Sequence, residues 1–266
     1  QLQFTKEGAH STPRILFHED ITGKEITSHL LKAVQALPNV TIYDHVTMVD
    51  IITSKPPAPH CQGIVAMAPF DSPLAIQYGK TKTRNGQVLF ALEAPEVVWA
   101  CGGIGGLYEH STNFSHLTGD ALGIALRNHI RLQNPDYIQI HPTTLYTGKP
   151  GRSFLISESV RGEGGILLND RRKRFVNELL PRDVVSNAIL AEMSRTGTKH
   201  VWLSLEKIPP KVILSHFKHI YEKCLEEGYD CTKEPIPVVP AQHYFMGGVD
   251  VDHNSQTSLA QLYAVG

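Results

Sequence analysis

One arginine occupies an unusual position for its charge. Arg182 lies in "LPRDVVSNAI", directly before an apolar run that predicts a helix. The first turn of a helix is the positive end of its dipole, where Asp183 is the more favourable residue. A residue placed against the local electrostatics indicates a functional role. Because a guanidinium has a pKa above about 12, it is suited to stabilising negative charge rather than to giving up a proton.

Two histidines stand next to strand-like runs. His141 ends "YIQI" and precedes a proline, and His243 lies in "AQHYFMGG", ahead of a glycine pair. An imidazole can bind a carboxylate or move a proton near neutral pH. A lone histidine also serves as a structural hydrogen-bonding group, so both interpretations stay open at each position.

Two glycine-containing stretches carry further candidates. "WACGGIGG", residues 99–106, is a hydrophobic strand followed by glycines, which let the backbone approach a phosphate closely. It is not the GxGxxG fingerprint of a βαβ unit, so a structural turn and a cofactor contact both stay open. "ISESVRGEGGILLN" holds four polar residues that are either structural ion pairs or parts of a site: Ser157, Glu158, Arg161 and Glu163.

The composition is that of a globular protein and excludes several function classes. The chain has 266 residues, 41% hydrophobic and 19% charged, with a net charge of −1. We therefore expect no nucleic-acid or membrane partner, and we interpret the cations at 171–174 as a solvated hairpin tip. The four scattered cysteines predict no metal site and a reduced, cytoplasmic setting. The start has no signal peptide and no initiator methionine, which indicates a fragment.

The hydrophobic pattern predicts α/β and α+β elements that position these residues. Thr22 and Glu25 predict a capping box at the start of a first helix. The further expected elements are, in chain order, a strand at 39–53, a β-meander at 62–100, a helix opening behind Thr118 and Asp120, a helix at 183–196 closed by Gly197, a long helix at 209–228, an extended connection at 233–245 and β-structure to the end.

Near Arg131 the sequence pattern changes to mixed short strands, and this change predicts two domains. We expect a larger α/β domain at 1–130, a smaller α+β domain at 131–242, and a return to the larger domain at 243–266.

The order of the motifs resembles the succinate dehydrogenase/fumarate reductase flavoprotein family over essentially the whole chain. The matching stretches are "GAHSTPRILFHEDITGKEI", "ACGGIGGLYEHSTN…TGDALGIA", "QIHPTTL", "SESVRGEGGILLN…RFVNE…LPRDVVSNAI" and "HYFMGGVDVD…LYAVG". The resemblance implies FAD as cofactor and a dicarboxylate as substrate. It also implies that 1–130 is a partial Rossmann-like FAD-binding domain, that 131–242 is a capping or substrate domain, and that 243–266 is a truncated return to the FAD-binding domain. Within the family, the chain is most similar to members that oxidise L-aspartate.

The resemblance also implies roles for individual residues. Arg182 matches the catalytic arginine, and Arg161 and Glu163 are its proton relay or its scaffold. Five residues match substrate contacts: Glu7, Gln139, His141, Ser157 and His243. Glu7 pairs with a substrate ammonium in this interpretation, although a surface glutamate is the alternative. Five residues match FAD contacts, with Cys101 in place of the usual threonine beside them: Thr47, Met48, Gly102, Gly103 and Asp120.

The implied activity is oxidation of L-aspartate to iminoaspartate by hydride transfer to FAD, as the first step of NAD biosynthesis, with oxygen or fumarate as acceptor. A fumarate reductase or succinate dehydrogenase flavoprotein subunit and a non-catalytic dicarboxylate-binding domain are the alternatives. Quinolinate synthase is a further expected partner. Since no GxGxxG unit is present, we expect these 266 residues alone to bind FAD weakly or not at all and to lack turnover.

Overall fold

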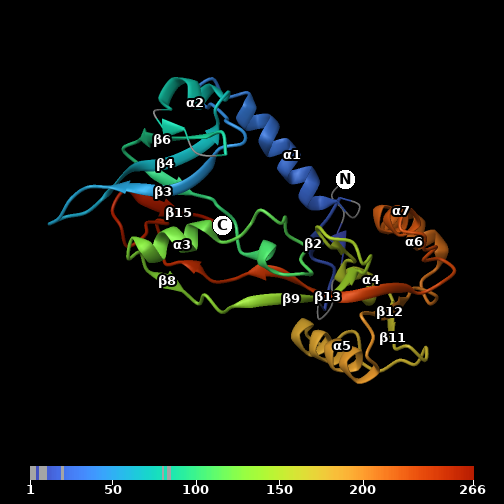
Figure 1. Cartoon of the computed structure of the whole chain (residues 1–266). Helices are drawn as coiled ribbons and strands as arrows, with labels where there is room; N and C mark the ends of the chain where they lie inside the picture. Colours follow the sequence, from blue (N-terminus) through green and yellow to red (C-terminus); the bar gives the residue numbers. More distant parts are fainter. Residues whose placement is uncertain (1–3, 6–10, 19–20, 80, 83–84) are drawn as a thin grey trace. The chain divides into compact units, whose positions relative to one another are not determined.

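The computed structural model describes residues 4–5, 11–18, 21–79, 81–82 and 85–266 (Figure 1). The chain divides into two compact units, each assembled from three stretches. The first unit consists of 1–37, 105–115 and 139–244, and the second consists of 38–104, 116–138 and 245–266. The boundaries at 138/139 and 244/245 differ from those expected at 130/131 and 242/243, and the first unit also includes 1–37 and 105–115. The assignment of these units to FAD and substrate stays a prediction.

A five-stranded sheet forms the centre of the first unit. Its strand order is β10 (Phe154–Leu155), β9 (Ile138–Leu145), β13 (Ile236–Phe245), β12 (Val201–Ser204) and β11 (Ile166–Leu168). The expectation that 233–245 is only a connection is wrong, because most of it is the central strand β13. Its prolines lack amide donors, but their segment still accepts hydrogen bonds, for example at Pro237 O from Tyr146 N over 3.0 Å.

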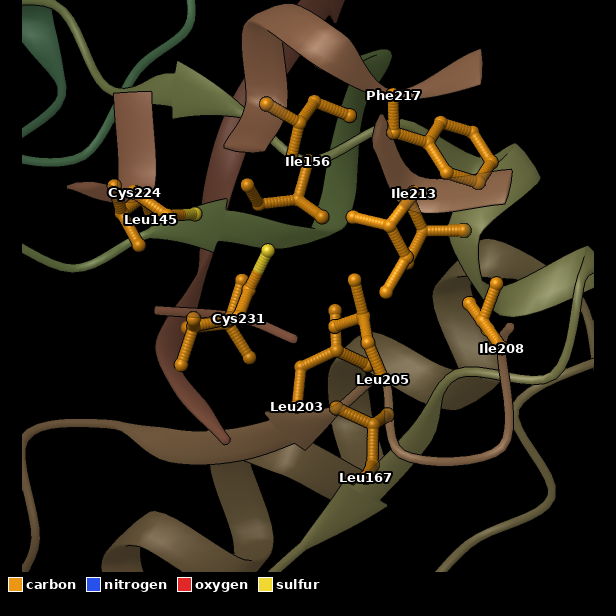
Figure 2. Close-up of a cluster of buried hydrophobic side chains, with 14 of the residues drawn as sticks. Leu145, Ile156, Leu167, Leu203, Leu205, Ile208, Ile213, Phe217, Cys224 and Cys231 are labelled. Carbon is orange, nitrogen blue, oxygen red and sulfur yellow. The ribbon is translucent and has the colours of Figure 1, made fainter. Parts of the chain in front are cut away.

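Helices pack against this sheet around one apolar core. Helix α5 (Arg182–Thr196) ends at Gly197 with a left-handed φ of 69°, as predicted. The long helix expected at 209–228 is two helices, α6 (Pro210–His216) and α7 (Lys218–Glu226). The break falls at Phe217, whose φ of −121° lies outside the helical range while its ring is buried. Figure 2 shows the ring of Phe217 in this core, together with the sulfur-bearing side chains of Cys224 and Cys231.

The N-terminal stretch contains a short antiparallel pair, β1 (Phe4–Thr5) with β2 (Ile15–Leu16), and helix α1 (Thr22–Gln35). The predicted capping box is wrong. Because α1 starts at Thr22 itself, the threonine hydroxyl accepts from the amide of His18 at 3.0 Å, and Glu25 pairs with His29. No residue of α1 is buried.

The second unit contains a four-stranded antiparallel sheet in the order β3 (Thr47–Thr53), β4 (Cys61–Pro69), β6 (Gln87–Glu93) and β5 (Thr81–Lys82). Helix α2 (Pro73–Tyr78) packs on it, with Ser72 as its cap. This confirms most of the predicted meander. The exception is β7 (Val97–Trp99), which instead pairs in parallel with β15 (Leu262–Ala264).

The remaining elements of the second unit surround β7. Helix α3 (Asp120–Arg127) begins after Gly119, and β8 (Leu132–Gln133) pairs with β14 (Gly248–Val249). Trp99, Ile124 and Leu262 are buried in one cluster there. Within the described residues, no helix has the length and apolar content needed to cross a membrane, and no three metal-binding side chains gather.

The basic run at 171–174 belongs to a turn, as predicted. Leu168 and Arg174 form an antiparallel bridge around it, and Asn169 Oδ1 accepts from the amides of Arg171 and Lys173 at 3.0 Å. Arg174 pairs with Glu178 at 2.6 Å. The turn is therefore held by local contacts of the first unit.

Candidate active site

Arg182 is held by two side chains that lie far from it in the sequence. As the first residue of α5, it follows Pro181, and its side chain is 27% exposed. Its Nε donates to Glu158 Oε2 at 2.7 Å, and its Nη1 donates to Gln139 Oε1 at 2.8 Å. The unfavourable position at the positive end of the helix is thus offset by a carboxylate.

Glu158 lies between two guanidiniums. It is the first residue of α4 (Glu158–Gly162), and its Oε1 is 3.5 Å from Nη2 of Arg161 on the same helix. The Arg161 side chain is only 1% exposed, and its Nη1 donates to Glu178 O at 2.5 Å. Burial lowers the pKa of Arg161, and the Glu158 carboxylate opposes this shift. Glu158 and Arg161 are therefore ion-paired, which is the structural role expected as one alternative for these residues. The same carboxylate also binds Arg182.

The two predicted histidines come together on neighbouring strands. His141 on β9 and His243 on β13 have ring centroids 5.2 Å apart. Burial, then the charges of His243, Arg161 and Arg182, lower the pKa of His141 well below its usual value. Burial and Arg182 lower the pKa of His243 to about 4. Both imidazoles are therefore neutral at pH 7 and lie within electrostatic reach of Arg182.

The other predicted substrate residues have different outcomes. Gln139 contacts Arg182 directly and so belongs to the cluster. Ser157 is the cap residue of α4, where its hydroxyl accepts from Ser159 N at 3.3 Å, and its substrate role stays a prediction. Glu163, considered as a relay to Arg182, is exposed at the end of α4, so Glu158 has the contact instead. Glu7 lies outside the described residues.

The predicted FAD contacts all lie in the second unit. Gly102 has a φ of 71°, and a Cβ there would meet Leu117 at 3.0 Å, while a Cβ on Gly103 would meet Phe245 at 3.0 Å. Only glycines fit these positions easily, which is the property a close backbone approach to a cofactor requires. Asp120 begins α3 and accepts from Thr118 Oγ1 at 2.8 Å.

Two observations connect these FAD-contact candidates with one another. The charge of Asp120 contributes to the raised pKa of Cys101, after burial as the main cause, so the two lie near each other. Met48 packs on the cluster that contains Trp99 and Ala121, whereas Thr47 is exposed at the start of β3. The glycine turn at 102–103, the exposed Thr47 at the start of β3 and the carboxylate of Asp120 are compatible with contacts to FAD.

One polar contact of the site was not predicted. Thr112 Oγ1 lies 2.8 Å from Nδ1 of His243. The threonine belongs to "HSTN", a stretch with no local signal beyond its place in the family pattern, because the contact joins residues 131 positions apart. A cavity of about 760 Å³ lies in the same unit and shares Ser111 and Asn113 with this stretch, but none of the predicted site residues lines it.

Comparison with known proteins identifies the family. The chain matches the FAD binding domain family over residues 1–266 and belongs to that family. FAD is accordingly its cofactor class, and the mixed α/β architecture fits that class.

Comparison with individual proteins gives more specific similarities. The chain is 47% identical to an L-aspartate oxidase of Clostridium perfringens over 99% of this chain and 56% of the relative. It is 42% identical to an L-aspartate oxidase of Clostridium acetobutylicum over 100% of this chain and 57% of the relative. A solved quinol-fumarate reductase with menaquinol has a TM-score of 0.82 at 31% identity, covering 99% of this chain and 46% of that one. The chain thus spans about half the length of its relatives.

Proposed function

We propose that the protein containing this chain oxidises L-aspartate to iminoaspartate in an FAD-dependent reaction. The sequence identity to the clostridial L-aspartate oxidases supports the substrate. The observation that carries the chemistry is the pair of neutral imidazoles 5.2 Å apart, together with Arg182, whose charge acts on both of them and whose side chain Glu158 and Gln139 hold. A dicarboxylate that leaves water needs such cationic and hydrogen-bonding partners, because an unpaired buried charge is very costly.

Different side chains of this cluster have different roles in the proposed binding of the substrate. His141 and His243 are neutral and each offer one N–H to a carboxylate oxygen, together with Gln139 and Ser157 in the proposed contact set. Glu158 holds Arg182 in place, so that the guanidinium faces the bound diacid with a fixed geometry. Two guanidiniums around one carboxylate leave a single net positive charge, which favours an anionic substrate.

Arg182 stabilises the negative charge that develops in the transition state and keeps its own proton, because guanidinium is too weak an acid to act readily as a proton donor. When bound, FAD supplies the hydride acceptor that the protein side chains lack. We propose that Thr47, Met48, Gly102, Gly103 and Asp120 hold this cofactor, and that the second unit is part of the FAD-binding domain while the central part of the first unit is the capping domain.

The proposal extends to the biological setting. The product would enter NAD biosynthesis, with oxygen or fumarate re-oxidising the flavin, quinolinate synthase as a partner and the cytoplasm as location. These points come from the resemblance to the family.

The experiment is an assay of the full-length protein loaded with FAD. We expect L-aspartate to bleach the flavin absorbance without oxygen and to yield hydrogen peroxide with oxygen, while succinate does neither. Rapid reduction by succinate alone would instead favour a fumarate reductase flavoprotein, the second candidate, which the 0.82 TM-score to quinol-fumarate reductase supports. A protein that binds dicarboxylates but has no flavin absorbance would overturn both enzymatic proposals.

A further inference from the structure

A short stretch of the first unit holds both the backbone and the side chain of His243. Gln242 N donates to His110 O and Thr112 N donates to Gln242 O, both over 2.9 Å. Asn113 Nδ2 donates to His243 O at 3.3 Å. The segment 110–113 is therefore paired with the end of β13, and the position of the imidazole is fixed relative to it.

The hydroxyl of Thr112 has two acceptors within reach. It lies 2.8 Å from His243 Nδ1 and 3.4 Å from Gln242 O. Normal O–H···acceptor distances end near about 3.0 Å, so the single hydroxyl proton is best placed toward Nδ1. Thr112 is 4% exposed, and its carbonyl accepts from Arg152 Nε at 2.6 Å, so the backbone of this residue is held as well.

This choice of proton position decides what His243 can do. A neutral imidazole carries one N–H, and its other nitrogen is an acceptor. If Nδ1 accepts from Thr112, the proton is on Nε2, and the ring can donate to a carboxylate. If the proton were on Nδ1, the free Nε2 lone pair would face an anion that also only accepts. The low pKa of His243 makes this distinction important, because protonation of both nitrogens is unfavourable at pH 7.

His141 has a related arrangement that does not need a side-chain partner. Its Nδ1 lies 3.2 Å from Thr143 N, a backbone donor, and 3.2 Å from Thr143 O. The two imidazoles are thus oriented by different means, one by its own strand and one by a hydroxyl from another segment. Only the second can be removed by a single conservative substitution.

We propose that Thr112 is a positioning residue that selects the Nε2–H tautomer of His243 and thereby makes this imidazole a hydrogen-bond donor to a substrate carboxylate. The inference rests on the proposed function for the identity of the carboxylate. The tautomer itself is a property of these residues alone.

The first test observes the tautomer in the full-length protein. With ¹⁵N-labelled histidine, long-range ¹H–¹⁵N spectra report which ring nitrogen carries the proton, and H243Q identifies the signal. We expect Nε2–H in the wild type and in T112S, which keeps the hydroxyl, and a shift toward Nδ1–H in T112V. An Nδ1–H signal in the wild type, or an unchanged tautomer in T112V, overturns the inference.

The second test separates positioning from general stability. T112V should raise the KM for L-aspartate about tenfold with a smaller change in kcat, and T112S should restore it to within about twofold. T144V is the matched control, because Thr144 is a buried threonine like Thr112, but its hydroxyl donates to a backbone carbonyl, Val239 O at 2.9 Å, and not to a histidine. An equal KM increase in T144V and T112V would overturn the inference. If the wild type does not oxidise L-aspartate, the proposed function fails, and the tautomer measurement still decides the role of Thr112.

Discussion

Replacing Glu158 by glutamine tests the electrostatic centre of the site. The substitution keeps the side-chain size and removes the one charge that lies between Arg161 and Arg182. Coulomb's law with an effective dielectric constant of about 20 gives about 5 kcal/mol for opposite charges at the 3.5 Å of the Arg161 pair. Arg182 adds less, because its side chain is 27% exposed. The amide oxygen of glutamine retains part of the attraction, so we expect a loss of about 3 kcal/mol of unfolding free energy.

The assay combines thermal unfolding with kinetics. A loss of about 3 kcal/mol lowers the Tm by about 6–12 °C in a protein of this size. Under the proposed function, the loss of this carboxylate should also lower kcat/KM for L-aspartate at least about 100-fold, because Arg182 would keep only its contact with Gln139 and lose its fixed orientation. E163Q is the matched control, five positions along the chain and exposed, and should leave both quantities unchanged. If E158Q unfolds within 1 °C of the wild type, Glu158 does not carry the charge balance described here.

Three further predictions concern other parts of the molecule. The folded-state pKa of His243 is about 4 against the usual 6.5, so the unfolded chain takes up protons first on acidification. The unfolding free energy should therefore have its highest contribution from His243 above pH 6.5 and fall by about 2 kcal/mol toward pH 4, after allowance for solvent screening. Urea titrations should show a shallower pH dependence in H243Q, and an identical slope would contradict the neutral imidazole. Iodoacetamide should alkylate Cys101 in the folded protein because this residue is exposed to solvent, although partial desolvation of its thiol raises its pKa and slows the reaction. Mass spectrometry should find the buried thiols modified only after unfolding, namely Cys61, Cys224 and Cys231. G197A should lower the unfolding free energy by about 1 kcal/mol through the left-handed φ of 69° alone, because a Cβ there would meet nothing within 4 Å. A loss above about 3 kcal/mol in urea unfolding would indicate a contact that the structure lacks.

The sequence predicted helices and strands well where the structure of a segment depends on its own residues and not on distant ones. The helix at 183–196 ends at Gly197 because only a residue tolerant of a left-handed φ fits there, and this requirement is visible in the sequence. The break at Phe217 was not predictable, because the periodic pattern continues through it and the interruption coincides with a ring buried in the shared core. The strand at 236–245 was missed because its prolines suggest a connection, although its neighbours supply the required donors.

For the candidate site, the sequence predicted the types of residues but not the contacts between them. Arg182, His141 and His243 could be selected from the sequence because each stands in a distinctive motif. The choice of Glu158 over Glu163 as the partner of Arg182 depends on which side of a five-residue helix faces α5. Thr112 could not be selected at all, since the contact that defines it arises only from tertiary packing over 131 residues.

The placement of the two imidazoles on hydrogen-bonded neighbouring strands has a consequence for how such a site can evolve. The distance between the two rings is limited by the spacing of the hydrogen-bonded strands β9 and β13 that carry them, so a large change in it requires a change in the sheet. The guanidinium of Arg182, by contrast, is held by the side chains of Glu158 and Gln139, so a substitution at either residue can change its orientation. Under the proposed function, adaptation to a longer or shorter diacid should therefore begin at the start of α5 and leave β9 and β13 unchanged.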